Sequence, residues 1–234
     1  MQAILDREIK AYFQSPLGYV FVGVMFLFTG YFFFAYNLYG NTTDMRGIFS
    51  TLFTVVLFLI PILTMRLMSE DKKLKTDQLL LTAPISKTGL VLGKYIAAIL
   101  VYLLSIMSTL VVAVVISRMN PPEWPVILGH FFGLFFLGIT LISICLFLSS
   151  LTESQVVAAV GGFAASFFLM LIDTLAPVIS NPFFSLILEK LSFQNRYNSF
   201  TLGIIRLEDL IFFLSISAMF LGFTVGALDK RRWS

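Results

Sequence analysis

Residues 91–117 read VLGKYIAAILVYLLSIMSTLVVAVVIS, and this stretch decides the fold of the chain. It contains no charged residue after Lys94, and it exceeds the roughly 20 residues that a helix needs to cross the hydrocarbon core of a bilayer. Because hydrocarbon offers backbone N–H and C=O groups no other partners, such a segment crosses as a helix. We therefore expect residues 91–117 to span a membrane.

Further stretches have the same apolar character. The composition agrees, since 58% of the 234 residues are hydrophobic and 12% are charged, whereas soluble domains are about 45–50% apolar and about 25% charged. The sequence therefore predicts a single, all-α, polytopic membrane domain with six transmembrane helices. Besides 91–117, the predicted spans run from about 16–38, 48–68, 125–149, 155–172 and 207–228.

Basic residues fall unevenly on the two sides of the predicted spans. With both termini in the cytoplasm, the inner segments hold Arg7, Lys10, Arg66, Lys72, Lys73, Lys75, Lys87, Lys94, Lys230, Arg231 and Arg232. The outer segments hold fewer, namely Arg46, Arg118, Lys190, Arg196 and Arg206. Since basic residues accumulate in cytoplasmic loops, this pattern predicts cytoplasmic termini. The formal charge of +3 thus reflects membrane topology and not nucleic-acid binding.

Residues 1–15 form a separate predicted unit. Most of their apolar side chains share one helical face, and polar side chains occupy the other: Ile4, Leu5, Ile9, Tyr12 and Phe13 against Arg7, Lys10 and Gln14. This pattern predicts an amphipathic helix that lies in the plane of the membrane interface. Ser15-Pro16 ends it and begins the first span. The alternative is a cytosolic tail.

Two connections between predicted spans carry structure of their own. In the inner loop, residues 66–94, Thr76 or Asp77 caps a short helix that Pro84 ends, and its leucines need cover from span ends or from a second protein. In the outer loop, residues 173–206, an amphipathic pattern over 183–193 is too short to span and predicts a helix or re-entrant element.

Chemistry-bearing residues are sparse. No acidic or basic residue lies near the middle of a predicted span, where ion-coupled transporters place them. The single histidine, His130, is expected at the membrane interface and not as a ligand. Gly89–Lys94 lacks the spacing of a phosphate-binding loop, and Tyr95 replaces its Ser or Thr. We expect no catalytic, cofactor or metal site in the chain.

Small-residue pairs also occur in the predicted spans. Gly129 and Gly133, and likewise Gly222 and Gly226, are separated by three residues. This spacing permits close helix approach, either inside the bundle or between two copies.

The longer motifs carry a family resemblance. Residues 7–20, REIKAYFQSPLGYV, and residues 61–86, PILTMRLMSEDKKLKTDQLLLTAPIS, resemble the membrane permeases of type-2 ABC exporters. They are most similar to the gliding-motility-associated and nitrous-oxide-cluster-like branch. The closing residues 229–233 also fit. The resemblance implies two permeases and two cytosolic ATPase subunits in a bacterial inner membrane, with ATP and Mg bound by the ATPases. An accessory periplasmic or membrane subunit is a further possible partner.

The resemblance also assigns roles to residues. The inner loop resembles the helix that docks on the ATPase, with these coupling residues: Glu70, Lys75, Thr76, Leu79, Leu80, Leu81 and Pro84. Asp77 replaces the more usual glutamate. The N-terminal helix is similar to the family's elbow helix, with Arg7, Lys10, Tyr12 and Phe13 in it. By analogy, the permeases meet through the first, second and fifth spans.

The expected function is the permease subunit of an ATP-driven exporter. One alternative is a membrane anchor that transmits force from an ATPase without a transported substrate. Another is a transporter or channel that works without ATP. A membrane-embedded enzyme is disfavoured by the lone histidine.

Overall fold

The computed structural model describes residues 2–76, 86–118, 123–175, 182–204 and 206–233, and every regular element within these ranges is helical. Six helices or joined helix pairs are long and apolar enough to span a membrane. They are α2 (Pro16–Phe32) with the π-helical η1 (Phe33–Leu38), α3 (Arg46–Thr64) with α4 (Arg66–Lys73), α6 (Lys87–Ile116), α7 (Trp124–Leu151), α8 (Gln155–Leu175) and α11 (Leu207–Trp233). The prediction of an all-α polytopic membrane protein is confirmed.

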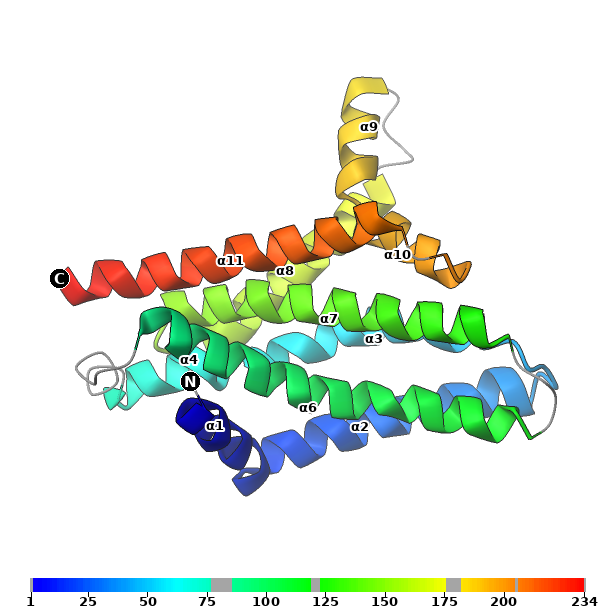
Figure 1. The fold of residues 1–234 in the computed structure, drawn as a ribbon, viewed down its shortest axis with the longest axis horizontal. Coiled ribbons are helices and arrows are strands. Elements are labelled where there is room, and N and C mark those ends of the chain that lie inside the picture. The colour runs from blue at the N-terminus through cyan, green and yellow to red at the C-terminus, as the bar shows by residue number, and fades with distance from the viewer. Residues whose placement is uncertain (1, 77–85, 119–122, 176–181, 205, 234) are drawn as a thin grey trace.

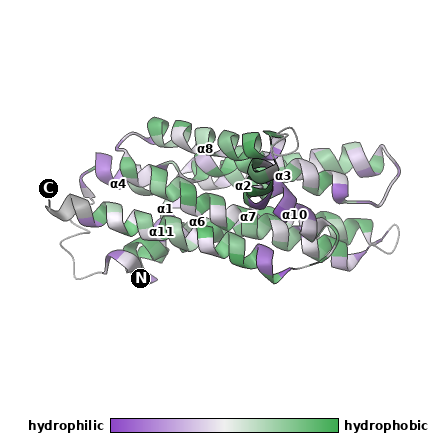
Figure 2. Ribbon diagram, turned by 90° about the horizontal axis from the view of Figure 1, so that it is seen from above, coloured by the Kyte–Doolittle hydropathy of each residue, from purple (hydrophilic) through white to green (hydrophobic). Residues whose placement is uncertain are grey.

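The helix α7 lies at the centre of the bundle. It packs against α3, α6, α8, α10 (Phe193–Thr201) and α11, and 72% of its most apolar window is buried, compared with 22% for α2 and 17% for α11. Hydrophobic residues cover most of the length of the helices (Figure 2). Since the outer faces of α2 and α11 are apolar and uncovered within the chain, they are suited to lipid contact.

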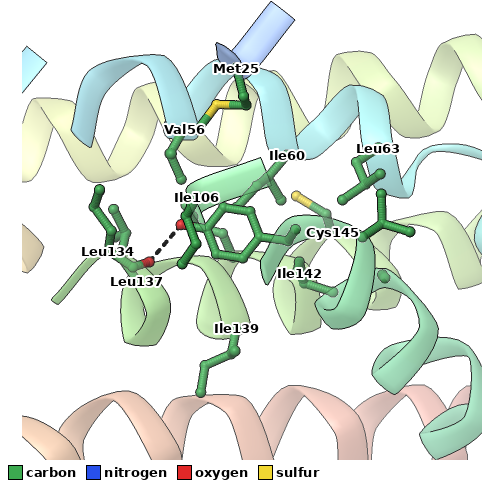
Figure 3. Close-up of a cluster of buried hydrophobic side chains, with 14 of the residues drawn as sticks. Met25, Val56, Ile60, Leu63, Ile106, Leu134, Leu137, Ile139, Ile142 and Cys145 are labelled. Atoms are coloured by element: carbon green, nitrogen blue, oxygen red, sulfur yellow. Dashed lines mark hydrogen bonds between the residues drawn. The ribbon is translucent and has the colours of Figure 1, made fainter. Parts of the chain in front are cut away.

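The core lies between α3, α6 and α7 (Figure 3). Val56, Ile60, Ile106 and Ile142 are fully buried there. Tyr102 crosses from α6 to α7, where its hydroxyl donates to Leu134 O at 2.6 Å. A Cβ atom on Gly138 would lie 2.0 Å from the Tyr102 ring, so this close helix approach requires glycine.

Both chain termini lie at the same end of the bundle (Figure 1). That end also holds α1 (Gln2–Gln14), α4 and the start of α6, and we call it the loop end. The opposite end, which holds the start of α7 and the helix α10, is the far end.

Helical structure at the loop end extends beyond the predicted membrane spans. The second span was expected to end near residue 68 and the third to begin near residue 91, but α4 continues to Lys73 and α6 begins at Lys87. Met65 alone separates α3 from α4. At this break Met65 N still donates to Pro61 O at 3.0 Å, whereas the N–H groups of Met68 and Ser69 bond to Ser149 of α7.

The far end contains two short helices in the predicted amphipathic segment. The helix α10 packs closely on α7, because a Cβ atom on Gly129 would lie 2.4 Å from Phe200 O, and one on Gly133 would lie 2.8 Å from the Tyr197 ring. This glycine pair therefore serves packing within the chain. The helix α9 (Pro182–Leu191) projects away from the bundle and exposes apolar side chains (Figure 1).

The sequence analysis expected His130 to lie at the membrane interface, but its side chain is enclosed by protein. It is 1% exposed, and its ring stacks on Phe49 with centroids 4.6 Å apart. Its Nδ1 atom lies 3.3 Å from the Tyr197 hydroxyl. The His130 ring is enclosed because α10 docks on α7. Hydropathy along the sequence does not predict this packing.

Candidate functional site

Four charged side chains from three helices meet at the loop end: Arg7 and Glu8 of α1, Asp71 of α4 and Lys94 of α6. We call them the charge cluster. Lys94 Nζ lies 2.9 Å from Glu8 Oε1 and 2.6 Å from Asp71 Oδ2. Arg7 Nη2 lies 2.7 Å from Glu8 Oε1 and 3.1 Å from Asp71 Oδ1. The cluster thus ties the N-terminal helix to both sides of the predicted inner loop.

Lys94 is the hub of the charge cluster. Its side chain is 2% exposed, and Nζ also donates to Leu67 O at 2.5 Å. An ammonium group has three donors, so the two carboxylates and this carbonyl satisfy all of them. A buried charge that loses its partner costs several kcal/mol. The three helices are therefore held together as a set, since each of the two carboxylates pairs with both cations.

The face of α1 that packs on the protein includes a carboxylate. Ile4, Glu8 and Tyr12 are buried there, against α6 and α2. The face expected to lie in the membrane interface is thus partly covered by protein, while Phe13 is half-buried and Lys10 is exposed. Glu8 lies four residues from both Ile4 and Tyr12, so helical periodicity alone was enough to place it on this face.

Tyr12 and Arg7 contribute to this contact differently. The Tyr12 hydroxyl donates to Leu63 O of α3 at 3.0 Å, and burial raises the pKa of Tyr12 well above its usual range, which keeps it a neutral donor. For Arg7, burial lowers the pKa, but the hydrogen bonds and charges of Glu8 and Asp71 raise it overall. Arg7 therefore stays charged.

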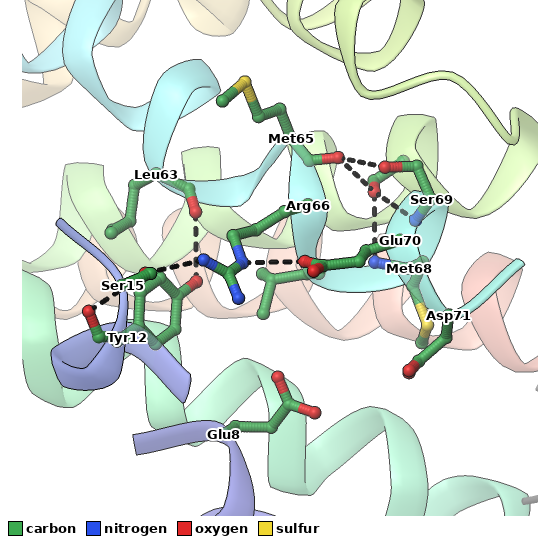
Figure 4. A network of polar contacts seen from close by, with 12 residues as sticks. Glu8, Tyr12, Ser15, Leu63, Met65, Arg66, Met68, Ser69, Glu70 and Asp71 are labelled. Atoms are coloured by element: carbon green, nitrogen blue, oxygen red, sulfur yellow. Dashed lines mark hydrogen bonds and ion pairs between the residues drawn. The ribbon is translucent and has the colours of Figure 1, made fainter. Parts of the chain in front are cut away.

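A second polar link joins α4 to the end of α1 (Figure 4). Arg66 Nη1 donates to Ser15 Oγ at 2.7 Å, and its Nε lies 2.9 Å from Glu70 Oε2. Glu70, a predicted coupling residue, thus orients Arg66 from one turn along α4. The Arg66 guanidinium also lies 6.0 Å from the centre of the Tyr12 ring.

The other predicted coupling residues differ in position. Thr76 donates to Asp71 Oδ1 at 2.9 Å, which connects it to the charge cluster. Lys75 is exposed and has a φ of +56°, so the chain turns sharply after α4. The remaining ones lie outside the described residues: Leu79, Leu80, Leu81 and Pro84.

The α6 side of the inner loop is fixed separately. Ser86 Oγ accepts from Gly89 N at 3.2 Å and caps the start of α6. Lys87 pairs with Asp229 near the end of α11. Both ends of the loop are thus anchored to the bundle, by Asp71 on one side and by Lys87 and Lys94 on the other.

This arrangement joins helices through buried charges. Among the described residues, no group of three or more His, Cys, Asp or Glu side chains is placed to hold a metal ion. Buried ion pairs that join three helices transmit displacement, because the helices cannot separate without exposing unpaired charge. The loop end is therefore held together as one unit of α1, α4 and α6.

Comparison with known proteins identifies the kind of protein. A family model described as ABC-2 family transporter protein matches residues 2–228, which include the charge cluster and nearly all of the candidate spans. No curated protein matches the chain. Members of this family are membrane components that work with ABC ATPase partners. The chain belongs to the ABC-2 transporter family and is a multi-pass membrane permease component of an ABC transporter.

Proposed function

We propose that this permease works as an exporter of a bacterial inner membrane, with its loop end in the cytoplasm. Two copies assemble with two ATPase subunits, which bind ATP and Mg and dock on residues 66–94. The excess of basic residues at the loop end supports this orientation. The outer faces of α2 and α8 are largely uncovered within the chain and are available to a second copy.

The observation that carries the coupling role is the charge cluster. It lies where the loop joins the bundle, and it connects Asp71 of α4 with α1 and α6. A displacement of the loop by a closing ATPase therefore reaches the N-terminal helix α1 and the third span, α6, directly. Rigid-body movement of these helices changes access between the two copies. Transport follows if the substrate binds the two access states with different affinity.

The test is replacement of the loop leucines by charge. Leu80→Asp with Leu81→Asp should abolish co-purification of the ATPase and its stimulation, because the docking surface loses its apolar contact. Leu202→Asp, at an exposed position of the far end, is the matched control and should keep both. Light scattering of the wild-type complex should give two copies of each subunit.

Two results would contradict the proposal. One is ATPase association that survives the double substitution. The other is a wild-type chain that purifies without any nucleotide-hydrolysing subunit. If the ATPase co-purifies but no candidate lipid, drug or peptide alters its turnover, the exporter assignment gives way to a force-transmitting anchor.

A further inference from the structure

The start of α4 is capped by a residue from another helix. The first N–H groups of any helix have no partner within it, and Met65, at the N-cap of α4, supplies no side-chain bond. Ser149 of α7 supplies it instead. Its Oγ accepts from Met68 N and from Ser69 N, both at 3.1 Å, and donates to Met65 O at 3.0 Å. A hydroxyl has one donor and two acceptor positions, so Ser149 uses all three at this break.

The end of α7 is capped from α4 in return. The last carbonyls of a helix also lack partners within it, and Lys72 of α4 donates its ammonium to Ser150 O. Lys72 is buried, and its charge lies at the negative end of the α7 dipole. We call this pair of contacts, made by Ser149 and Lys72, the reciprocal cap.

The reciprocal cap lies at the break between α3 and α4 and adds α7 to the helices that hold α4. The helix is interrupted at Met65, between α3 and α4, so α4 is not a stiff continuation of α3. The cap holds the two sides of this break against the same turn of α7, and Ser149 is fully buried there. Since α7 packs against α3, α6, α8, α10 and α11, a displacement that reaches α7 reaches most of the bundle.

We propose that Ser149 is a positioning residue for ATPase coupling. Through the reciprocal cap, α4 and the loop end of α7 move as one rigid body when the ATPase displaces the loop. The charge cluster carries the movement to α1 and α6, and the reciprocal cap carries it to the central helix. This inference rests on the proposed function.

The first test needs no substitution in the cap. Spin labels at Leu74→Cys and Leu151→Cys, which are exposed on the two sides of the cap, report the distance between α4 and α7. The native Cys145 is buried and does not compete for label. The complex with its ATPase, reconstituted in nanodiscs with excess unlabelled chain, should give one narrow distance distribution that nucleotide does not change. A nucleotide-dependent change of that distance would overturn the inference.

A reference label separates this outcome from failure of the proposed function. Leu74→Cys alone, undiluted, reports the distance between the two copies. It should change on nucleotide binding. If it does not, the loop end does not move with the ATPase cycle, and the proposed function fails. If it changes together with the Leu74–Leu151 distance, only the rigid-body inference fails.

Substitution of the cap gives the second test. Ser149→Ala should leave ATPase co-purification intact, reduce ATPase stimulation by about threefold or more, and make the Leu74–Leu151 distance nucleotide-dependent. Ser150→Ala is the matched control, because its equally buried hydroxyl bonds only to Phe147 O of its own helix at 2.6 Å. It should match the wild type. Equal behaviour of the two variants in both assays would refute the assignment.

Discussion

The loop end and the far end of this permease are held together by different kinds of interaction. At the loop end, charged and hydroxyl side chains bridge α1, α4, α6 and α7 through defined bonds, with Lys94 and Ser149 fully enclosed. At the far end, α10 sits on α7 by shape, with the Tyr197 and Phe200 side chains against glycines. The far end also has a partly buried ion pair, Arg196 to Asp209 at 3.0 Å, but it joins neighbouring segments α10 and α11.

This difference indicates where each end yields. Packing of aromatic rings on glycine is short-ranged, since a gap of about 0.5–1 Å forfeits roughly a quarter to a half of the contact energy, but its loss leaves no charge unpaired. Buried ion pairs behave as a set, because separation of any member leaves a charge without solvent or partner. Separation of helices therefore costs charge compensation at the loop end, whereas at the far end it costs mainly packing contacts.

The largest expected effect is at Lys94. Lys94→Met removes the buried cation that Glu8 and Asp71 share and leaves them only the partly exposed Arg7. Loss of one partner from a buried ion pair costs about 3–5 kcal/mol. We expect a clearly lower melting temperature in detergent and loss of ATPase stimulation. Lys10→Met, an exposed change on α1, is the control. Equal melting temperatures for the two variants would remove the contrast between the ends.

An intermediate effect is expected at Gly129. Gly129→Ala forces a methyl group against Phe200 O, and overpacking of this kind costs about 1–3 kcal/mol. Hydrogen exchange should show weaker protection of α10, while ATPase stimulation persists. Gly222→Ala meets nothing within 4 Å and should leave both measurements unchanged. If the Gly129 variant abolished stimulation, the far end would be as directly coupled as the loop end.

The smallest expected effect is at Tyr12. Tyr12→Phe removes one buried hydrogen bond, to Leu63 O, which is worth about 1 kcal/mol. Because burial raises the pKa of Tyr12, the hydroxyl stays protonated and the difference in melting temperature should be the same at neutral and mildly alkaline pH. Tyr39→Phe changes a highly exposed hydroxyl and should have no effect. A Tyr12 variant as stable as the Tyr39 variant would show that this bond is not needed.

The fold was predictable because a long apolar segment in a bilayer satisfies its backbone hydrogen bonds by forming a helix. The helical segment Pro16–Leu38 has the bounds of the predicted first span, since a proline begins the run and polar residues follow it. The end of the helix that contains the second span was not predictable in this way. Hydropathy falls at Ser69–Lys73 whether or not the helix continues, so it does not report that α4 persists to Lys73.

The site was only partly predictable. The inner loop stood out by its leucines and charges, but its most buried charged residue, Lys94, was not among the predicted coupling residues. Lys94 meets Glu8 across 86 residues of sequence, and Arg7 meets Asp71 across 64. Such pairs depend on how helices pack, which one sequence does not record. One signal was present, because a lysine one turn inside an apolar run requires a buried partner.

The most direct test of the coupling account is contact between the loop and the ATPase in cells. A photo-crosslinking amino acid at Leu80 should trap a subunit that mass spectrometry identifies as an ATP-binding cassette ATPase, and the same amino acid at Leu202 should not. Absence of this subunit from the Leu80 product, or its presence in the Leu202 product, would contradict the account.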